Sequence, residues 1–448
     1  MRFSSFEELF HHYAERTPDA PALRYEEGGA PRMMTYAELE RAITLRAAEL
    51  RAGGKTCLGI FADRSRACVT EIFAAVRAGV QIVLLDADAP LPILRGLLPY
   101  TDVDSLWGDA SLCDELSGNL ARGVREGKGK ILFFTSGTTE RSKAVVLTEK
   151  SLCASTYNGA TLLPLLPQDT LLCILPLSHV FGFVCGLLWA FSCGACVALG
   201  RGARHYINDC VFFRPTVLPV VPLQLSFLLK QNLLNHELRL LLVGAGDCPA
   251  ALLRAARMCV ANVSFGYGLT ETSSGVALSL GDDPYAMTVC PDYDVTIAPD
   301  GEILVKVRSC MMKGYYKCPE ETNTALAGGM LSTGDLGRID EKGRLYVTGR
   351  KKDMFVLSDG TKLFLPEAEA ELGKLLGNVD FALVMAGENV VLAIHGDTRS
   401  DEELFAAIAP YQNTRPRTQQ VAHILRQRSP LPRTAAGKAK RWALHTKP

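Results

Sequence analysis

A polar loop at residues 135–143 has the residue types best suited to chemistry in this chain, and it directly follows the apolar run 131–134. An apolar run of this kind predicts a strand that ends in the loop. The loop combines hydroxyl groups, a glycine and one lysine, a donor set that fits the oxygens of a polyphosphate. The G-x-x-x-x-G-K-[ST] spacing of the common nucleotide loop is absent, which indicates a different class of phosphate-handling protein. The candidate phosphate ligands are Thr135, Ser136, Gly137, Thr138, Thr139 and Lys143.

Four further motifs follow the loop in the chain, and each has an ordinary explanation when taken alone. Tyr267 suits a core aromatic, Asp335 suits a β-turn, and Lys438 suits a solvated lysine in a basic tail. Their occurrence together, in this order and at this spacing, indicates that the motifs have one common explanation. The motifs are Gly-Tyr-Gly-Leu-Thr-Glu at 266–271, Ser-Thr-Gly-Asp at 332–335, Gly-Arg-Lys-Lys-Asp at 349–353 and Pro-Arg-Thr-Ala-Ala-Gly-Lys at 432–438.

Together, the five motifs resemble the adenylate-forming superfamily, which includes acyl-CoA synthetases, luciferases and the adenylation domains of peptide synthetases. The resemblance spans essentially the whole chain. It implies an AMP-binding N-terminal domain at residues 1–349, built from parallel-type α/β subdomains and a β-rich subdomain. It also implies a small mobile α+β lid domain at residues 350–448, with a hinge near Lys352. The predicted fold class is therefore α/β and acyl-CoA synthetase-like.

The resemblance also implies which part of ATP each residue would bind. The loop at 135–143 would hold the β- and γ-phosphates, Tyr267 would stack on adenine, and Asp335 would accept the ribose hydroxyls. Glu271 would be the Mg²⁺ ligand, a hard carboxylate for a hard cation. The other residues that the resemblance assigns to nucleotide or thiol binding are Gly244, Ala245, Gly246, Gly266, Gly268, Arg350 and Gly360.

The implied reaction has two steps. A carboxylate attacks the α-phosphate of ATP to give an acyl-adenylate and pyrophosphate, and a thiol then takes the acyl group and releases AMP. The thiol would be CoA or the phosphopantetheine of a carrier protein. Lys438 would bridge the two anionic groups and offset their repulsion. Thr270, Glu271 and His179 complete the implied catalytic set, although His179 equally suits a hydrogen-bonded core histidine.

The substrate is expected to be a fatty acid. Amino-acid-activating members hold the α-amine with an aspartate near the start of the segment at 175–183, and no acid is present there. The sequence motif at 349–360 is most similar to that of long-chain fatty acyl-CoA synthetases. An apolar pocket near Phe181, Phe183 and Val220 would suit a fatty or aryl acid. An acyl-carrier-protein ligase, an aryl-acid adenylating enzyme and a non-catalytic nucleotide-binding homologue remain as alternatives.

Four positions depart from the commonest pattern of the superfamily. Glu140 and Ala144 replace glycines, and Ser142 replaces a proline. Phe265 stands where an amide or acid usually lies, which puts one nucleotide contact in doubt. Most of the other motif residues are intact, which argues against a non-catalytic homologue.

Hydrophobic patterning predicts the elements that position these residues. Short apolar runs at 57–61 and 81–85 flank a helical pattern at 65–79, a βαβ arrangement that implies a parallel sheet. Asp300-Gly301 and Lys342-Gly343 are typical of hairpin turns. Residues 171–200 carry no charge and exceed the ~18 residues of a membrane span. Prolines and glycines interrupt this segment, so strand–helix–strand burial is the preferred interpretation.

Composition narrows the function further. A net charge of +0 argues against a general nucleic-acid binder, and 14 cysteines in mostly apolar contexts indicate a reducing, cytoplasmic location. Glu7 and Glu8 interrupt any signal-peptide core, and peripheral membrane contact stays open. From Leu404 to Pro448 there are nine Lys or Arg and no acid. This segment indicates an anionic ligand or acidic partner, or else a solvated face balanced by nearby carboxylates.

Overall fold

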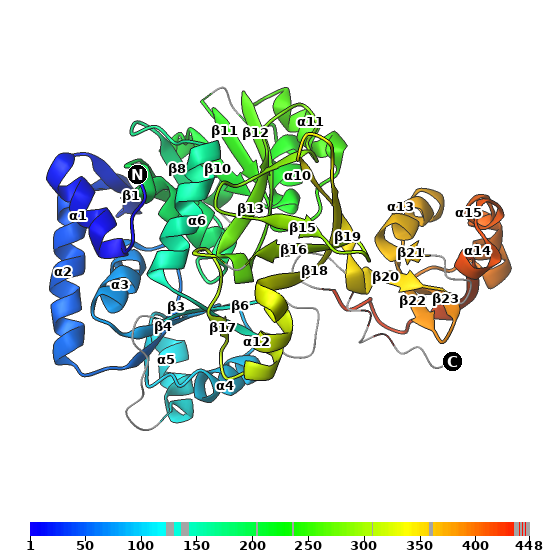
Figure 1. Cartoon of the computed structure of the whole chain (residues 1–448), viewed down its shortest axis with the longest axis horizontal. Coiled ribbons are helices and arrows are strands. Elements are labelled where there is room, and N and C mark those ends of the chain that lie inside the picture. The colour runs from blue at the N-terminus through cyan, green and yellow to red at the C-terminus, as the bar shows by residue number, and fades with distance from the viewer. Residues whose placement is uncertain are drawn as a thin grey trace.

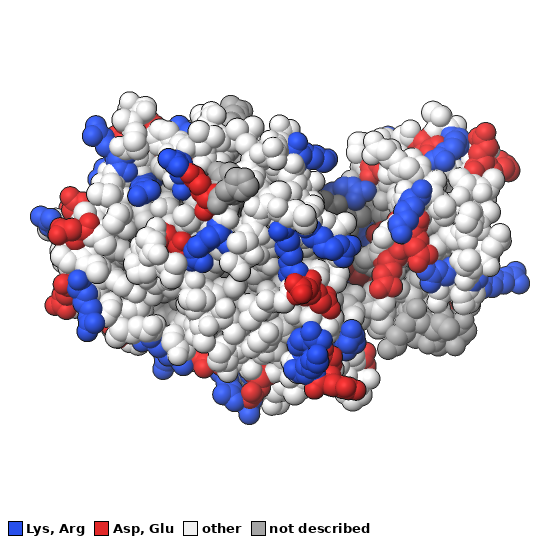
Figure 2. Space-filling model, turned by 90° about the horizontal axis from the view of Figure 1, so that it is seen from above, with Lys and Arg blue, Asp and Glu red and all other residues white. Residues whose placement is uncertain are grey.

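The computed structural model of the chain has a large body and a smaller C-terminal unit beside it (Figure 1). Acidic and basic side chains are interspersed over the face seen in Figure 2, in keeping with the net charge of +0. The structure describes residues 1–121, 130–135, 143–202, 205–234, 237–306, 308–357, 362–433, 439, 441 and 444.

A six-stranded sheet of order β17-β7-β6-β4-β3-β5 forms one layer of the body. Strands β5, β3, β4 and β6 run parallel, and every residue of β3 and β4 is buried, as expected for parallel strands covered on both faces. The predicted βαβ unit is thereby confirmed. The elements are β3 (Cys57–Phe61), α3 (Arg66–Arg77), β4 (Gln81–Leu85), α4 (Leu91–Tyr100), β5 (Ser105–Trp107), α5 (Ala110–Leu116), β6 (Ile131–Phe134), β7 (Ala144–Leu147) and β17 (Gly314–Tyr315).

A thirteen-stranded sheet has the order β15-β16-β18-β19-β14-β13-β12-β11-β10-β8-β9-β1-β2. Its centre is parallel, and β12 changes the pattern at Gly266, pairing parallel with β11 before it and antiparallel with β13 from it onward. The parallel part and its neighbours are β1 (Pro21–Glu27), β2 (Ala30–Thr35), β8 (Thr170–Cys173), β9 (Cys196–Leu199), β10 (Val217–Val220), β11 (Leu240–Val243) and β12 (Asn262–Leu269). The antiparallel part is β13 (Ser274–Ser279), β14 (Met287–Val289), β15 (Val295–Ile297), β16 (Glu302–Lys306), β18 (Met330–Ile339) and β19 (Leu345–Arg350).

Helices join these sheets through one large core. The ring of Phe73 on α3 lies 5.1 Å from that of Phe6, 4.7 Å from that of Phe10 and 5.9 Å from that of Phe191. Edge-on aromatic contacts of this kind add to the burial of apolar area. The helices of the body are α1 (Phe6–Arg16), α2 (Tyr36–Ala52), α6 (Glu149–Leu162), α7 (Val180–Phe183), α8 (Trp189–Ser192), α9 (Tyr206–Phe213), α10 (Pro222–Lys230), α11 (Ala250–Arg257) and α12 (Pro319–Ala325). Short helical turns are η1 (Ser117–Asn119), the π-helical η2 (Val184–Leu188), η4 (Thr270–Thr272), η5 (Ala327–Gly329), η6 (Lys351–Asp353) and η7 (Arg417–Gln419).

The C-terminal unit has apolar clusters of its own, centred on side chains such as Leu372, Leu392 and Leu404. The predicted division at residue 349 stays a prediction, and these separate clusters are compatible with it. The elements are β20 (Met354–Val356), β21 (Lys362–Phe364), α13 (Leu365–Leu376), β22 (Asp380–Ala386), β23 (Asn389–His395), α14 (Asp401–Ala407), α15 (Ala409–Thr414) and β24 (Val421–Arg426).

The uncharged segment at 171–200 folds as expected from its prolines and glycines. Strand β8 leads into the helical run 180–192, and β9 returns parallel to β8. No helix in the described part of the chain has both the length and the apolar character that a membrane span needs. The predicted hairpin turns are also present, with Gly301 at φ 94° and Gly343 at φ 73°.

The basic C-terminal segment is balanced by carboxylates. Each of four arginines lies 2.5–2.8 Å from an acidic side chain of an earlier element. For these four, the structure supports the interpretation of positive charges balanced by nearby carboxylates. The pairs are Arg415–Glu371, Arg426–Asp401, Arg433–Asp380 and Arg441–Glu369.

Asp169 joins the beginnings of three neighbouring parallel strands. It precedes β8, and its Oδ1 accepts from Thr216 before β10 and from Arg239 Nε before β11, both at 2.7 Å. Its Oδ2 accepts from the Leu166 backbone N–H at 2.6 Å. Burial opposes ionisation, but the bonds from Arg239, Leu166 and Thr216 outweigh it and lower the pKa of Asp169.

We therefore expect Asp169→Asn to reduce the free energy of unfolding by about 2 kcal/mol at neutral pH, because it leaves Arg239 without its charged partner. A carboxyl group with a lowered folded-state pKa stabilises the fold above its unfolded pKa and loses this effect as pH falls through the folded pKa. Denaturant midpoints of wild type and variant should thus converge below about pH 4. A difference that does not change with pH would contradict this assignment.

Candidate active site

Three strands bring Tyr267, Asp335 and Arg350 into direct contact. Asp335 on β18 faces Arg350 on β19 in the antiparallel register, and Arg350 Nε lies 2.8 Å from Asp335 Oδ1. The Tyr267 hydroxyl, from β12, donates to Asp335 Oδ2 at 2.9 Å. Burial and the nearby Asp335 charge hold the pKa of Tyr267 well above its ordinary value, so its phenol stays a donor at neutral pH. The sequence motifs at 266–271, 332–335 and 349–353 thus meet at one carboxylate.

The turn before Asp335 fixes the direction of its side chain. Gly334 has a φ of 70°, which favours glycine, and its N–H donates to Glu302 Oε1 at 2.9 Å. The Thr333 hydroxyl accepts from the Asp335 N–H at 3.1 Å and donates to the Ile303 carbonyl at 2.7 Å. Strand β16, which carries Glu302 and Ile303, therefore holds this turn through two hydrogen bonds.

A second cluster joins Glu271, Tyr315 and Lys143. Glu271 lies in η4, and its Oε1 accepts from the Tyr315 hydroxyl at 2.8 Å. The Lys143 ammonium lies 4.5 Å from the centroid of the Tyr315 ring, within the range of a cation–π contact. Lys143 is also fixed to the strand end before it, because its carbonyl accepts from the Thr135 N–H at 3.0 Å. One tyrosine therefore contacts both the predicted metal ligand and the predicted phosphate-loop lysine.

The backbone around Glu271 is a tight, unusual turn. Ser273 and Ser274 have φ values of 53° and 97°, a left-handed conformation that costs non-glycine residues energy and often marks functional sites. Gly268 packs on this turn so closely that a Cβ there would lie 1.8 Å from the Ser274 carbonyl oxygen. The Thr272 hydroxyl donates to the Ser274 carbonyl at 2.9 Å. The glycine of the motif is thus needed for packing at this point.

The residues predicted for the adenine and acyl sides follow β11 and β8. Gly244 follows Val243, which pairs with Phe265 of β12, so Gly244–Gly246 and the 266–268 motif lie at one edge of the sheet. Ala245 has a φ of 62°, and a Cβ on Gly244 would come within 3.0 Å of the Phe181 ring. His179 is exposed at the start of α7, which excludes the alternative of a core histidine.

Two of the sequence departures have structural explanations. Phe265 is 9% exposed and its ring lies 6.2 Å from that of Tyr285, so it is a core residue. Ala144 is fully buried in β7 and pairs with Phe134 in a regular antiparallel register, where the freedom of a glycine is not required. Glu140 and Ser142 lie outside the described residues.

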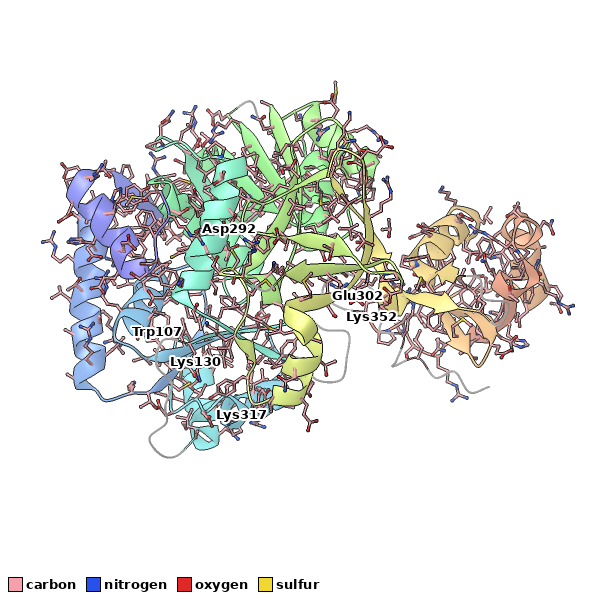
Figure 3. The ribbon with its side chains drawn as sticks, viewed as in Figure 1. Trp107, Lys130, Asp292, Glu302, Lys317 and Lys352 are labelled. Carbon is pink, nitrogen blue, oxygen red and sulfur yellow. The ribbon has the colours of Figure 1, made fainter. Side chains whose placement is uncertain are left out.

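The predicted hinge residue, Lys352 (Figure 3), lies between two neighbours that contact different parts of the chain. Lys351 Nζ lies 2.7 Å from both Asp300 Oδ2 and Glu302 Oε2, which belong to the large body. Asp353 Oδ1 lies 3.3 Å from Nη1 of Arg441, a residue of the C-terminal unit. Lys352 separates them in the chain.

The structure thus describes most of the predicted site residues and brings five of them, Lys143, Tyr267, Glu271, Asp335 and Arg350, into two clusters. Sequence reasoning missed Tyr315 and Glu302, which carry no recognisable motif and act only through contacts with distant residues. No group of three or more potential metal-ligating side chains occurs within the described part of the chain. The predicted site residues that fall outside it are Ser136, Gly137, Thr138, Thr139, Gly360 and Lys438.

Comparisons with known proteins identify the family of this chain. The model of the AMP-binding enzyme family matches residues 10–116 and 130–316. A 3-[(3aS,4S,7aS)-7a-methyl-1,5-dioxo-octahydro-1H-inden-4-yl]propanoyl:CoA ligase of Mycobacterium tuberculosis is 30% identical over 78% of this chain and 74% of its own length. A 2-succinylbenzoate–CoA ligase of Oceanobacillus iheyensis is 26% identical over 96% of this chain and 97% of its own.

The fold has a solved counterpart. The O-succinylbenzoate coenzyme A synthetase (MenE) of Bacillus subtilis, in complex with AMP, superposes with a TM-score of 0.82 at 24% identity, covering 98% of each chain. This similarity confirms the predicted acyl-CoA synthetase-like α/β fold. The match over most of the chain likewise confirms the predicted superfamily, and the chain belongs to the AMP-binding enzyme family.

Proposed function

We propose that this acid–thiol ligase activates a cyclic or aromatic carboxylic acid as its acyl-adenylate and passes the acyl group to CoA. The contact of Tyr267, Asp335 and Arg350 is the observation that supports the adenylation step, because it brings three motifs of the family together at one buried carboxylate. The two similar ligases described above both act on ring-containing acids, which favours this substrate class over the expected fatty acid. A long-chain fatty acid is the second candidate substrate, supported by the sequence motif at residues 349–360.

In the proposed site, Asp335 accepts the ribose hydroxyls of the nucleotide. Its two oxygens offer about four lone-pair positions, so ribose can bind in addition to Arg350 and Tyr267. Arg350 pairs with the carboxylate, and the hydrogen bond from the Tyr267 hydroxyl fixes the ring that would stack on adenine. The segment Gly244–Gly246 lies at the same sheet edge and would flank the base.

Glu271 is suited to hold Mg²⁺. This ion prefers oxygen ligands and keeps several waters, so one carboxylate together with substrate phosphates is an adequate set. When bound there, Mg²⁺ would neutralise charge on the phosphate oxygens. The Tyr315 hydroxyl donates to the Glu271 carboxylate and would orient it, and the Lys143 ammonium lies 4.5 Å from the centroid of the same Tyr315 ring. Thr270, next to Glu271, would contact a phosphate of the nucleotide.

Transfer to the thiol is the second proposed step. Rotation of the C-terminal unit about Lys352 would replace Lys438 with the loop containing Gly360. We place His179 at the entrance of the acyl site, since it is exposed at the start of α7. CoA is preferred over a carrier protein because both relatives described above are CoA ligases.

The decisive experiment is acid-dependent ATP–pyrophosphate exchange with a panel of cyclic, aromatic, fatty and amino acids, followed by product analysis with CoA and with a carrier protein as acceptors. We expect exchange with ring-containing acids and an acyl-CoA product. Exchange with long-chain acids alone would favour the second candidate. Absence of exchange with every acid, in a preparation that binds ATP, would overturn the assignment as a ligase.

Asp335→Asn should weaken AMP binding by about 30-fold, because the ribose hydroxyls lose a charged acceptor. Isothermal titration of AMP measures this effect. Asp340→Asn is the matched control, since Asp340 also pairs with an arginine, Arg344, but at the hairpin tip of β18 and β19. Equal AMP affinities of the two variants would contradict the ribose assignment.

Glu271→Gln should lower the exchange rate by about 100-fold, whereas Tyr315→Phe should mainly raise the Mg²⁺ concentration needed for half-maximal exchange, by about tenfold. The Tyr315 hydroxyl only orients the carboxylate, so excess Mg²⁺ should restore most of the activity of Tyr315→Phe. A Tyr315→Phe variant with normal Mg²⁺ dependence would show that this hydrogen bond has no part in metal binding.

A further inference from the structure

A closed ring of contacts connects the nucleotide site to the hinge. Glu302 is 7% exposed, and its Oε1 accepts from the Gly334 N–H at 2.9 Å. Gly334 precedes Asp335, which pairs with Arg350 across β18 and β19. Arg350 precedes Lys351, whose ammonium returns to Glu302 Oε2 at 2.7 Å. One buried carboxylate therefore holds both ends of the Asp335–Arg350 pair.

A second anchor lies directly beyond the hinge residue. Asp353 contacts Arg441 Nη1, and Arg441 Nη2 lies 2.8 Å from both oxygens of Glu369 on α13. Arg441 Nε also donates to the Leu383 carbonyl on β22 at 3.0 Å. Asp353 is thus fixed to the C-terminal unit, while Lys351 is fixed to the large body. Figure 3 shows Glu302 and Lys352 together at the junction of the two.

We propose that Glu302 is a positioning residue that couples the nucleotide site to the hinge, and that its bond to Lys351 confines the rotation of the C-terminal unit to the backbone at Lys352. This inference rests on the proposed two-step reaction. Residue 351 cannot turn with the C-terminal unit while its ammonium bridges Asp300 and Glu302, and residue 353 turns with that unit through Arg441. Hinges absorb such a change in the φ and ψ angles of a few residues, and here the two anchors would confine it to one.

The coupling has a physical consequence for the two half-reactions. If Lys351 were released, several residues would share the rotation, and the C-terminal unit would occupy more orientations. The fraction of molecules in each productive orientation would fall, because a competent state that is only partly populated lowers the apparent rate or affinity in proportion. The Gly334 bond, in contrast, acts on the Asp335 turn and therefore on nucleotide affinity.

Variants of Glu302 and Lys351 separate these two effects. Glu302→Gln keeps an oxygen that can accept from the Gly334 N–H but presents an amide donor to Lys351. It therefore breaks only the hinge half of the ring and leaves Lys351 with the more exposed Asp300 carboxylate. Lys351→Met breaks the same half from the other side. Glu302→Ala removes both halves, and Lys351→Arg keeps a cation that can bridge the two carboxylates. Lys342→Met, at the exposed tip of the β18–β19 hairpin, is the control for loss of one lysine charge.

We expect Glu302→Gln and Lys351→Met to bind AMP within about twofold of wild type but to transfer a preformed acyl-adenylate to CoA about tenfold more slowly. Glu302→Ala should in addition bind AMP about tenfold more weakly, through loss of the Gly334 bond. Lys351→Arg should recover most of the transfer rate, and Lys342→Met should match wild type. A general loss of stability would not produce this division between variants.

Backbone amide exchange gives a readout that does not depend on activity. The peptide spanning 350–353 should exchange faster in Glu302→Gln and Lys351→Met, while the Gly334 amide loses protection only in Glu302→Ala. If amide exchange at 350–353 were unchanged in both Glu302→Gln and Lys351→Met, the inference would be overturned. If instead wild type shows no acid-dependent pyrophosphate exchange, the proposed function fails, and the amide-exchange pattern still decides whether the ring restrains the hinge.

Discussion

A carboxylate that is 3% exposed has to find its cation and donors inside the protein, and Asp335 finds them in Arg350 and Tyr267. Removing a charge from water is costly unless such partners are held in good geometry. The surrounding backbone supplies that geometry: β18 and β19 pair in register, and β12 presents the tyrosine. The position of the site therefore depends on how three strands of the large sheet are aligned.

The change of pairing in β12 makes this alignment possible. Up to Phe265 the strand belongs to the parallel part of the sheet, and from Gly266 it belongs to the antiparallel part. Parallel strands end together at one edge, where ligands of α/β proteins commonly bind. The antiparallel extension carries β18 and β19 to that same region. The Gly-Tyr-Gly motif lies at this change of pairing, and Gly268 packs against the unusual turn that holds Glu271.

Two residues outside the motifs connect the parts of the site. Tyr315 contacts both Glu271 and Lys143, which are 128 positions apart in the chain. Glu302 supports the Asp335 turn and contacts Lys351 beside the predicted hinge. Both side chains act by orienting other groups, so their energetic contribution lies in keeping those groups in place before a ligand arrives. Such residues leave no spacing pattern, because their partners come from different elements.

The sequence by itself determined the family, the order of the motifs, the βαβ unit at 57–85 and the hairpin turns at Gly301 and Gly343. It also singled out Tyr267, Asp335 and Arg350 as candidate site residues. These features depend on local spacing and on side-chain chemistry. Only the tertiary structure decided that Phe265 is a core residue and that His179 is exposed. It also decided that four C-terminal arginines pair with carboxylates, and that Tyr315 and Glu302 contact the candidate site. Each of these depends on which distant segments meet, and burial and pairing are properties of the packed chain that local pattern does not contain.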